Sequence, residues 1–302
     1  MTGAWTRIGR VAVTEWRMAL RSRRALVTTL LFLAASGGIM YLMISVFSAM
    51  EAELVSLLGL PVSETTGSVS LTLWKSKPFV RMISHAVGNS LVFADIQGRH
   101  PILLAYALFV FQAVPLLTLM TSSARVADEI RSGAARWWLV RVTRTEWTLG
   151  KFFGEALMLA SAMFVGALAA DAVVCWRLPL AEGVRMLPGI LDWTARAWAY
   201  AFAWLGLFMG LSHLVKSGGK ATALGALAIL GVAAWSPMLN NLATDVPGFG
   251  WATHLDVLAP NGTWSLLWRR SPAVLLQGIV GLAAVAFLFL GLGAAVLRRR
   301  DI

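Results

Sequence analysis

The stretch PILLAYALFVFQAVPLLTLMTS, residues 101–122, contains no charged residue, whereas RVADEIRSGAARWWLVRVTRTEWTLGK, residues 125–151, contains nine. An apolar run of about 20 residues is long enough to cross the hydrocarbon core of a bilayer as a helix. In hydrocarbon an unpaired backbone N–H or C=O costs several kcal/mol, so the run must satisfy its own hydrogen bonds as an α-helix. The first stretch therefore predicts a membrane span, and the second predicts an ordered, charged segment beside the membrane.

The composition of the whole chain agrees with this interpretation. Of its 302 residues, 58% are hydrophobic and 14% are charged, whereas soluble domains carry roughly 25% charged residues. The surface of such a chain must face lipid, and the single Cys175 excludes an intramolecular disulfide. We predict a single all-α membrane domain, 1–302, with six spans at 26–50, 101–122, 152–175, 197–215, 221–239 and 273–297.

The distribution of Lys and Arg predicts the orientation of these spans. With the N-terminus in the cytoplasm, the cytoplasmic segments contain seventeen of the 26 basic residues, although they are the shorter set. Cytoplasmic loops carry the excess of Lys and Arg in membrane proteins, so we expect both termini on the cytoplasmic side of the cell membrane. The net charge of +11 then reflects contact with anionic lipid and not with nucleic acid. The extracytoplasmic segments are expected at 51–100, 176–196 and 240–272.

Residues 1–25 are expected to form an amphipathic helix in the inner membrane interface. On a helical wheel the aromatic and aliphatic side chains share one arc, and the arginines share the opposite arc. A helix of this kind binds at the boundary between headgroups and acyl chains. We predict that its apolar side enters lipid and that its basic side faces headgroups and water, with contacts from Trp5, Ile8, Trp16, Arg7, Arg10, Arg17 and Arg21.

The charged segment 123–151 is predicted to be cytoplasmic and to contain one helix over residues 126–141, with an apolar stripe for docking. Beside the stripe, Arg125 and Glu129 have the spacing of an i, i+4 ion pair. The segment thus combines a charged flank with an apolar base, which suits recognition by a partner protein.

Two acidic residues of the third span, Glu155 and Asp171, have simple structural explanations. Glu155 has the i, i+4 spacing for an ion pair with Lys151. Asp171 lies about one turn from the outer end of the span, where we expect it to cap the helix or to pair with Arg177 or Arg196.

These features resemble the membrane subunits of ATP-binding-cassette (ABC) transporters of the type-2 exporter class. In that family the link between spans two and three carries a Glu, a Gly after three further residues, an Arg, and a Gly-Lys pair that opens span three. The corresponding residues of this chain are Glu129, Gly133, Arg144, Gly150 and Lys151. The basic N-terminal helix with EWRMALRSRR, the six spans, the large outer segment after the first span and the basic ending LRRRDI are similar as well.

The resemblance implies that the link forms a coupling helix, which docks on a separate cytoplasmic ATPase and transmits its motion to the spans. It also implies two copies of that ATPase and a second permease copy, as a homodimer or with a similar permease. The chain lacks the G-x-x-x-x-G-K-[ST] motif of a P-loop, so we expect no enzymatic activity and no cofactor, ATP and Mg being bound by the ATPase. The expected coupling surface is Arg125, Asp128, Glu129, Arg131, Gly133, Arg136, Arg144, Gly150 and Lys151.

Two other functions remain open from the sequence. A membrane-embedded enzyme requires converging acid, base or metal groups, and an ion-gradient-driven transporter requires broken spans with charged groups near mid-membrane. We see neither pattern, and the four histidines lie too far apart to predict a metal site. Gly206 and Gly210 form a G-x-x-x-G pattern that permits close helix approach, either within this subunit or between two copies.

Overall fold

The computed structural model describes residues 3–58, 74, 77, 80–81, 84, 90–246 and 248–299, and within these ranges the chain is helical, with no strand. The long helices are α1 (Ala4–Leu20), α2 (Arg23–Leu58), α6 (Pro101–Ser122), α9 (Arg144–Arg177), α10 (Leu180–Leu214), α11 (Gly218–Asp245) and α12 (Pro272–Arg298). The short helices are α5 (Ser90–Ile96), α7 (Arg125–Ser132), α8 (Ala134–Leu139) and the 3₁₀ helices η3 (Gly250–Leu258) and η4 (Trp264–Trp268). Much of the predicted outer segment 51–100 lies outside the described residues.

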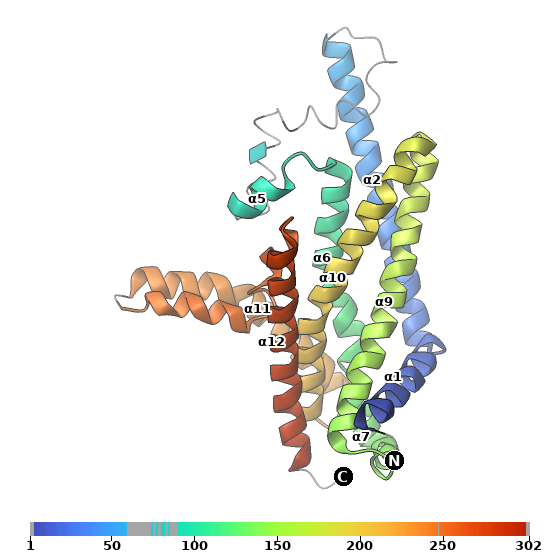
Figure 1. Ribbon diagram of the computed structural model, residues 1–302, viewed down its shortest axis with the longest axis vertical. Helices are drawn as coiled ribbons and strands as arrows, with labels where there is room; N and C mark the ends of the chain where they lie inside the picture. The colour runs from blue at the N-terminus through green and yellow to red at the C-terminus, as the bar shows by residue number, and fades with distance from the viewer. Residues whose placement is uncertain are drawn as a thin grey trace.

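Six of these helices are long and apolar enough to cross a membrane. They are α2, α6, α9, α10, α11 and α12, which confirms the predicted all-α fold class with six candidate spans. Five of them run roughly along the long axis of the molecule, and α10 lies among α6, α9 and α12 (Figure 1). α10 therefore forms the centre of the bundle, and 78% of its most apolar stretch of 18 residues is buried.

α10 begins at Leu180, well before the predicted span 197–215, and two charged residues of its first half, Asp192 and Arg196, form an ion pair. The Arg196 guanidinium donates to Asp192 Oδ1 at 2.9 Å and to the carbonyl of Leu267 at 2.7 Å. The predicted alternative in which Arg196 pairs with Asp171 is therefore wrong. Arg177 does not pair with Asp171 either, because its guanidinium lies over the ring of Tyr41.

Gly206 and Gly210 lie where α10 crosses α12 inside one subunit. A Cβ at position 206 would meet the Cα of Ala286 at 2.4 Å, and a Cβ at position 210 would meet the carbonyl oxygen of Phe289 at 2.5 Å. Such contacts are far inside van der Waals distance, so only glycine permits this approach of the two backbones. Of the two alternatives for the G-x-x-x-G pattern, the structure shows packing within the subunit.

α11 is placed differently from the other candidate spans. Together with η3 it extends sideways from the bundle, across the direction of α12 (Figure 1). Trp235 Nε1 donates to the carbonyl of Leu255 at 3.3 Å and so holds η3 against α11. Only 11% of the most apolar stretch of 18 residues in α11 is buried, and Leu227 and Leu230 are largely exposed.

Candidate functional site

The charged segment between α6 and α9 folds as two short helices. α7 ends at Ser132 and is followed by Gly133, whose φ of 75° lies in the left-handed region, and α8 begins at Ala134. Glycine adopts this conformation at little cost, whereas a residue with a Cβ is strained there. The predicted single helix over 126–141 is therefore wrong, because Gly133 turns the chain between its two halves.

The first residues of α9 end the segment with a capping box. The Thr143 hydroxyl accepts from the backbone N–H of Glu146 at 3.3 Å, and the Thr143 N–H donates to the Glu146 carboxylate at 3.0 Å. Each contact satisfies a donor that the start of a helix leaves unpaired. The capping box thereby fixes the beginning of α9 at Glu146, whose carboxylate also contacts α1 through Arg7.

Five charged side chains from three helices meet beneath this segment, and we name them the ion cluster: Glu15 of α1, Arg125 and Glu129 of α7, and Lys151 and Glu155 of α9. Lys151 Nζ donates to Glu15 Oε1 at 2.8 Å and also donates to Glu129. Arg125 Nε lies 2.7 Å from Glu155 Oε1, and its Nη1 lies 3.7 Å from Glu15 Oε2. The cluster thus connects α1, α7 and α9.

Both predicted i, i+4 pairs in this region are wrong. Arg125 pairs with Glu155 and Glu15 and not with Glu129, while Lys151 pairs with Glu129 and Glu15 and not with Glu155. Each cation takes its partners from another helix because the side chains point into the contact between the helices. There the carboxylates and cations are shielded from water, so their attraction is stronger than along an exposed helix face.

Burial makes the ion cluster sensitive to the loss of any member. The side chains of Lys151 and Glu15 are each 2% exposed, and that of Glu155 is 3% exposed. Removing one partner of a buried ion pair leaves an uncompensated charge and costs about 3–5 kcal/mol. The three helices are therefore held in one relative position as long as all five groups are present.

Two glycines of α9 allow α1 to lie close enough for these contacts. A Cβ at Gly150 would meet the Cβ of Val11 at 2.5 Å, and a Cβ at Gly154 would meet the Cβ of Glu15 at 2.6 Å. Gly150 was expected to shape the entry to the third span. In the structure Gly150 and Gly154 form a groove on α9, and α1 packs into this groove.

The apolar side of α1 consequently differs from its prediction. Ile8 and Ala12 are buried against α9 and do not face lipid. Trp16 is half-buried, and its Nε1 donates to Ser161 Oγ of α9 at 3.1 Å. Trp5, in contrast, is 78% exposed. The sequence contained a signal for this arrangement, because Glu15 lies on the apolar arc and a carboxylate there needs a protein partner.

The basic side of α1 divides into two parts. Arg7 donates from Nε and Nη2 to Glu146 Oε1 at 2.9 and 2.6 Å, and this hydrogen bond raises the pKa of Arg7 above its usual value. Arg10, Arg17 and Arg21 remain exposed. α1 is therefore attached to α9 by Arg7 and by the ion cluster, in addition to the Trp16–Ser161 hydrogen bond.

The other predicted coupling residues lie around the outside of the segment. Arg131 and Arg136 are exposed, and Arg131 Nη2 lies 3.2 Å from Asp128 Oδ1. Gly133 forms the turn between them, whereas Arg144 donates to the carbonyls of Leu297 at 2.7 Å and Arg298 at 3.0 Å. Arg144 thus ties the start of α9 to the C-terminal end of α12, where carbonyls lack helical partners.

The sequence analysis missed two exposed apolar residues next to these charges. Trp137 is 80% exposed and Val140 is 85% exposed. Large apolar side chains on a protein surface, and Trp and Arg together in particular, are typical of protein–protein contacts. The pair of tryptophans in RWWLV was the available signal, since only one of them can face the bundle.

Six apolar helices of spanning length, with a charged segment bound to α1 and α9 at one end of the bundle, define a multi-pass membrane protein. The chain belongs to the ABC-2 family of transporter proteins, because the model of that family, described as ABC-2 family transporter protein, matches residues 10–302. A comparison with curated proteins gives no match. The resemblance noted from the sequence is confirmed, and the protein is a membrane permease of an ABC transporter, whose family implies a partner ATP-binding subunit.

Proposed function

We propose that the protein is the permease subunit of an ABC exporter, in which a separate cytoplasmic ATPase drives movement of substrate across the membrane. The observation that carries the proposal is the segment between α6 and α9, which is exposed on one side and fixed to α1 and α9 by the ion cluster on the other. Membership of the ABC-2 family supports a partner that supplies ATP hydrolysis.

The exposed side of this segment is the proposed contact for the ATPase, and we name it the docking face: Arg131, Gly133, Arg136, Trp137 and Val140. Its exposed Trp lies beside two exposed Arg residues, the residue types that contribute most to binding energy at protein interfaces. Asp128, paired with Arg131, lies at its edge. The docking face includes three of the residues that the sequence analysis assigned to the coupling surface.

The remaining predicted coupling residues serve to transmit motion. A force on α7 acts on Arg125 and Glu129, which are bound to Glu155 and Lys151 of α9. Separating buried ion pairs costs more than moving the helices together. α7, α9 and α1 are therefore expected to shift as one body when the ATPase closes on ATP.

The arrangement of the helix ends supports a cytoplasmic location for this body. α1, α7 and the C-terminal end of α12 lie at the same end of the long axis (Figure 1). The positive-inside rule assigns the Arg-rich end to the cytoplasm. The exposed side of α1, with Trp5 and Arg10, Arg17 and Arg21, then contacts lipid headgroups.

A second permease copy completes the proposed complex as a homodimer that binds two ATPase subunits. The exposed apolar residues of α11 and η3 support it, because these elements extend from the bundle and the part of the chain that the structure describes leaves them largely uncovered. A translocation path would then run between the two copies.

Co-purification with the ATPase tests the proposal. The double variant Arg136→Glu and Trp137→Ala should lose the ATPase from the detergent-solubilised complex, because it reverses one charge and removes the largest apolar side chain of the docking face. Trp176→Ala is the matched control, since Trp176 is 73% exposed at the opposite end of α9. Retention of the ATPase by the double variant at the wild-type level would refute the assignment of the docking face.

A further inference from the structure

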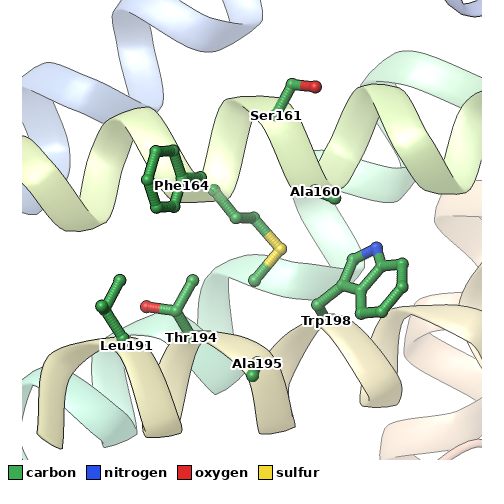
Figure 2. Close-up of a pocket in the computed structure, with 8 residues that line it drawn as sticks. Ala160, Ser161, Phe164, Leu191, Thr194, Ala195 and Trp198 are labelled. Carbon is green, nitrogen blue, oxygen red and sulfur yellow. The ribbon is translucent and has the colours of Figure 1, made fainter. Parts of the chain in front are cut away.

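A cleft of about 390 Å³ opens between α9 and α10, away from the charged segment. α9 contributes Ser161, Met163 and Phe164, and α10 contributes Thr194, Ala195 and Trp198. Figure 2 shows the two helices side by side, with Thr194 of α10 pointing toward α9. Met163 and Thr194 are buried and form the floor, whereas Phe164 and Ala195 are exposed at the rim. The volume lies within the range of about 300–1,000 Å³ typical of ligand sites.

The cleft lies at the depth of the hydrocarbon core. Positions 160–164 follow Lys151 by nine to thirteen residues, which at 1.5 Å per residue is about 14–20 Å along α9. The hydrocarbon core of a bilayer is about 30 Å thick, so the cleft lies within the part of α9 that crosses it. Leu157 and Leu168 on the same helix are exposed, and the cleft is continuous with this lipid-facing surface.

The hydrogen-bond donors that line the cleft are all satisfied within the protein. Trp198 Nε1 donates to the carbonyl of Ala156 at 2.8 Å, and Ser161 Oγ donates to that of Leu157 at 2.9 Å. Thr194 Oγ1 donates to the carbonyl of Ile190 at 2.7 Å and lies 2.9 Å from the Tyr106 hydroxyl.

This distribution of polar groups decides what can occupy the space. An ordered water needs two to four polar partners, and the apolar walls of the cleft do not supply them for a volume of this size. A polar ligand would lose its hydration without gaining new hydrogen bonds. A hydrocarbon chain requires no hydrogen bonds, and it surrounds the cleft on the lipid side.

We infer that this cleft binds one acyl chain of a membrane phospholipid between α9 and α10. α1 reaches the edge of the site, because Trp16 Nε1 donates to Ser161 Oγ. The bound lipid therefore belongs to the leaflet in which α1 lies, and it is held by the protein, unlike lipid that only surrounds the helices. The inference is independent of the ATPase and of the docking face.

Photo-crosslinking of the full-length protein tests the inference. The protein is reconstituted with phosphatidylcholine that carries a diazirine in the middle of one acyl chain, extracted into detergent, washed, irradiated and digested for peptide mass spectrometry. We expect adducts at positions 160–164 and 191–198 to persist through washing. Adducts at Leu276 and Val280 of α12, which are 61% and 59% exposed outside the cleft, should disappear with the bulk lipid.

A filled cleft provides the second arm of the test. Ala195→Phe places a ring at the rim and should abolish the persistent adducts, whereas Val280→Phe, on an open surface, should leave them unchanged. If Ala195→Phe impairs folding, the washing comparison in the wild-type protein decides by itself. Loss of cleft and α12 adducts at the same rate would overturn the inference, as would persistent adducts in a correctly folded Ala195→Phe protein.

Discussion

Replacement of Lys151 by Met tests whether the ion cluster holds α1, α7 and α9 together. Met keeps most of the length and the apolar stem of Lys and removes its charge. The substitution leaves Glu15, which is 2% exposed, without its closest cation, and Glu129 without the cation that it pairs with. We therefore expect a loss in the free energy of unfolding of about 3–5 kcal/mol, the cost of breaking a buried ion pair.

This loss is large compared with the total stability of a protein, which is about 5–15 kcal/mol. It can be measured by equilibrium unfolding of the purified protein in mixed detergent micelles, with Lys220→Met as the control. Lys220 is exposed in the first turn of α11, and an exposed substitution of this kind changes stability by no more than about 0.5 kcal/mol.

The double variant Lys151→Met and Glu15→Gln separates loss of the ion pair from loss of packing. Neutralising Glu15 removes one of the two orphaned charges, so the double variant should be more stable than the sum of the single losses predicts. Coupled residues in contact differ from additivity by about 0.5–3 kcal/mol. If Lys151→Met is as stable as Lys220→Met, or if the two changes are additive, the ion cluster does not join the helices as described.

Two further substitutions probe the glycines of the site. Gly154→Val should displace α1, because even its Cβ would lie 2.6 Å from the Cβ of Glu15. The expected cost of this overpacking is about 1–3 kcal/mol. A cysteine cross-link between α1 and α9 should form more slowly in this variant, and an unchanged rate would contradict the close contact. Gly133→Ala forces a side chain into a backbone with φ of 75°, at a cost of about 1–2 kcal/mol. Co-purification of the ATPase should weaken, while the melting temperature of the transmembrane bundle should change little. Full ATPase binding by this variant would show that the turn does not orient the docking face.

The sequence by itself determined the fold class and the family. Hydrocarbon permits only backbone that satisfies its own hydrogen bonds, so each long apolar run had to become a helix wherever it lay in the bundle. The charged segment between two such runs was recognisable for the same reason, because its residues could not lie within the hydrocarbon core without partners. The residues Glu129, Gly133, Gly150 and Lys151 then carried the resemblance to the family that matches the chain.

Only the tertiary structure decided which residues of that segment face inward. Sequence spacing describes neighbours along one helix, and it predicted the pairs Arg125–Glu129 and Lys151–Glu155. The attraction between charges depends instead on distance and on exclusion of water, and both are set where α1 enters the glycine groove of α9. That contact buries Glu15 and draws Lys151 and Arg125 toward it, whereas Trp137 of α8 remains exposed.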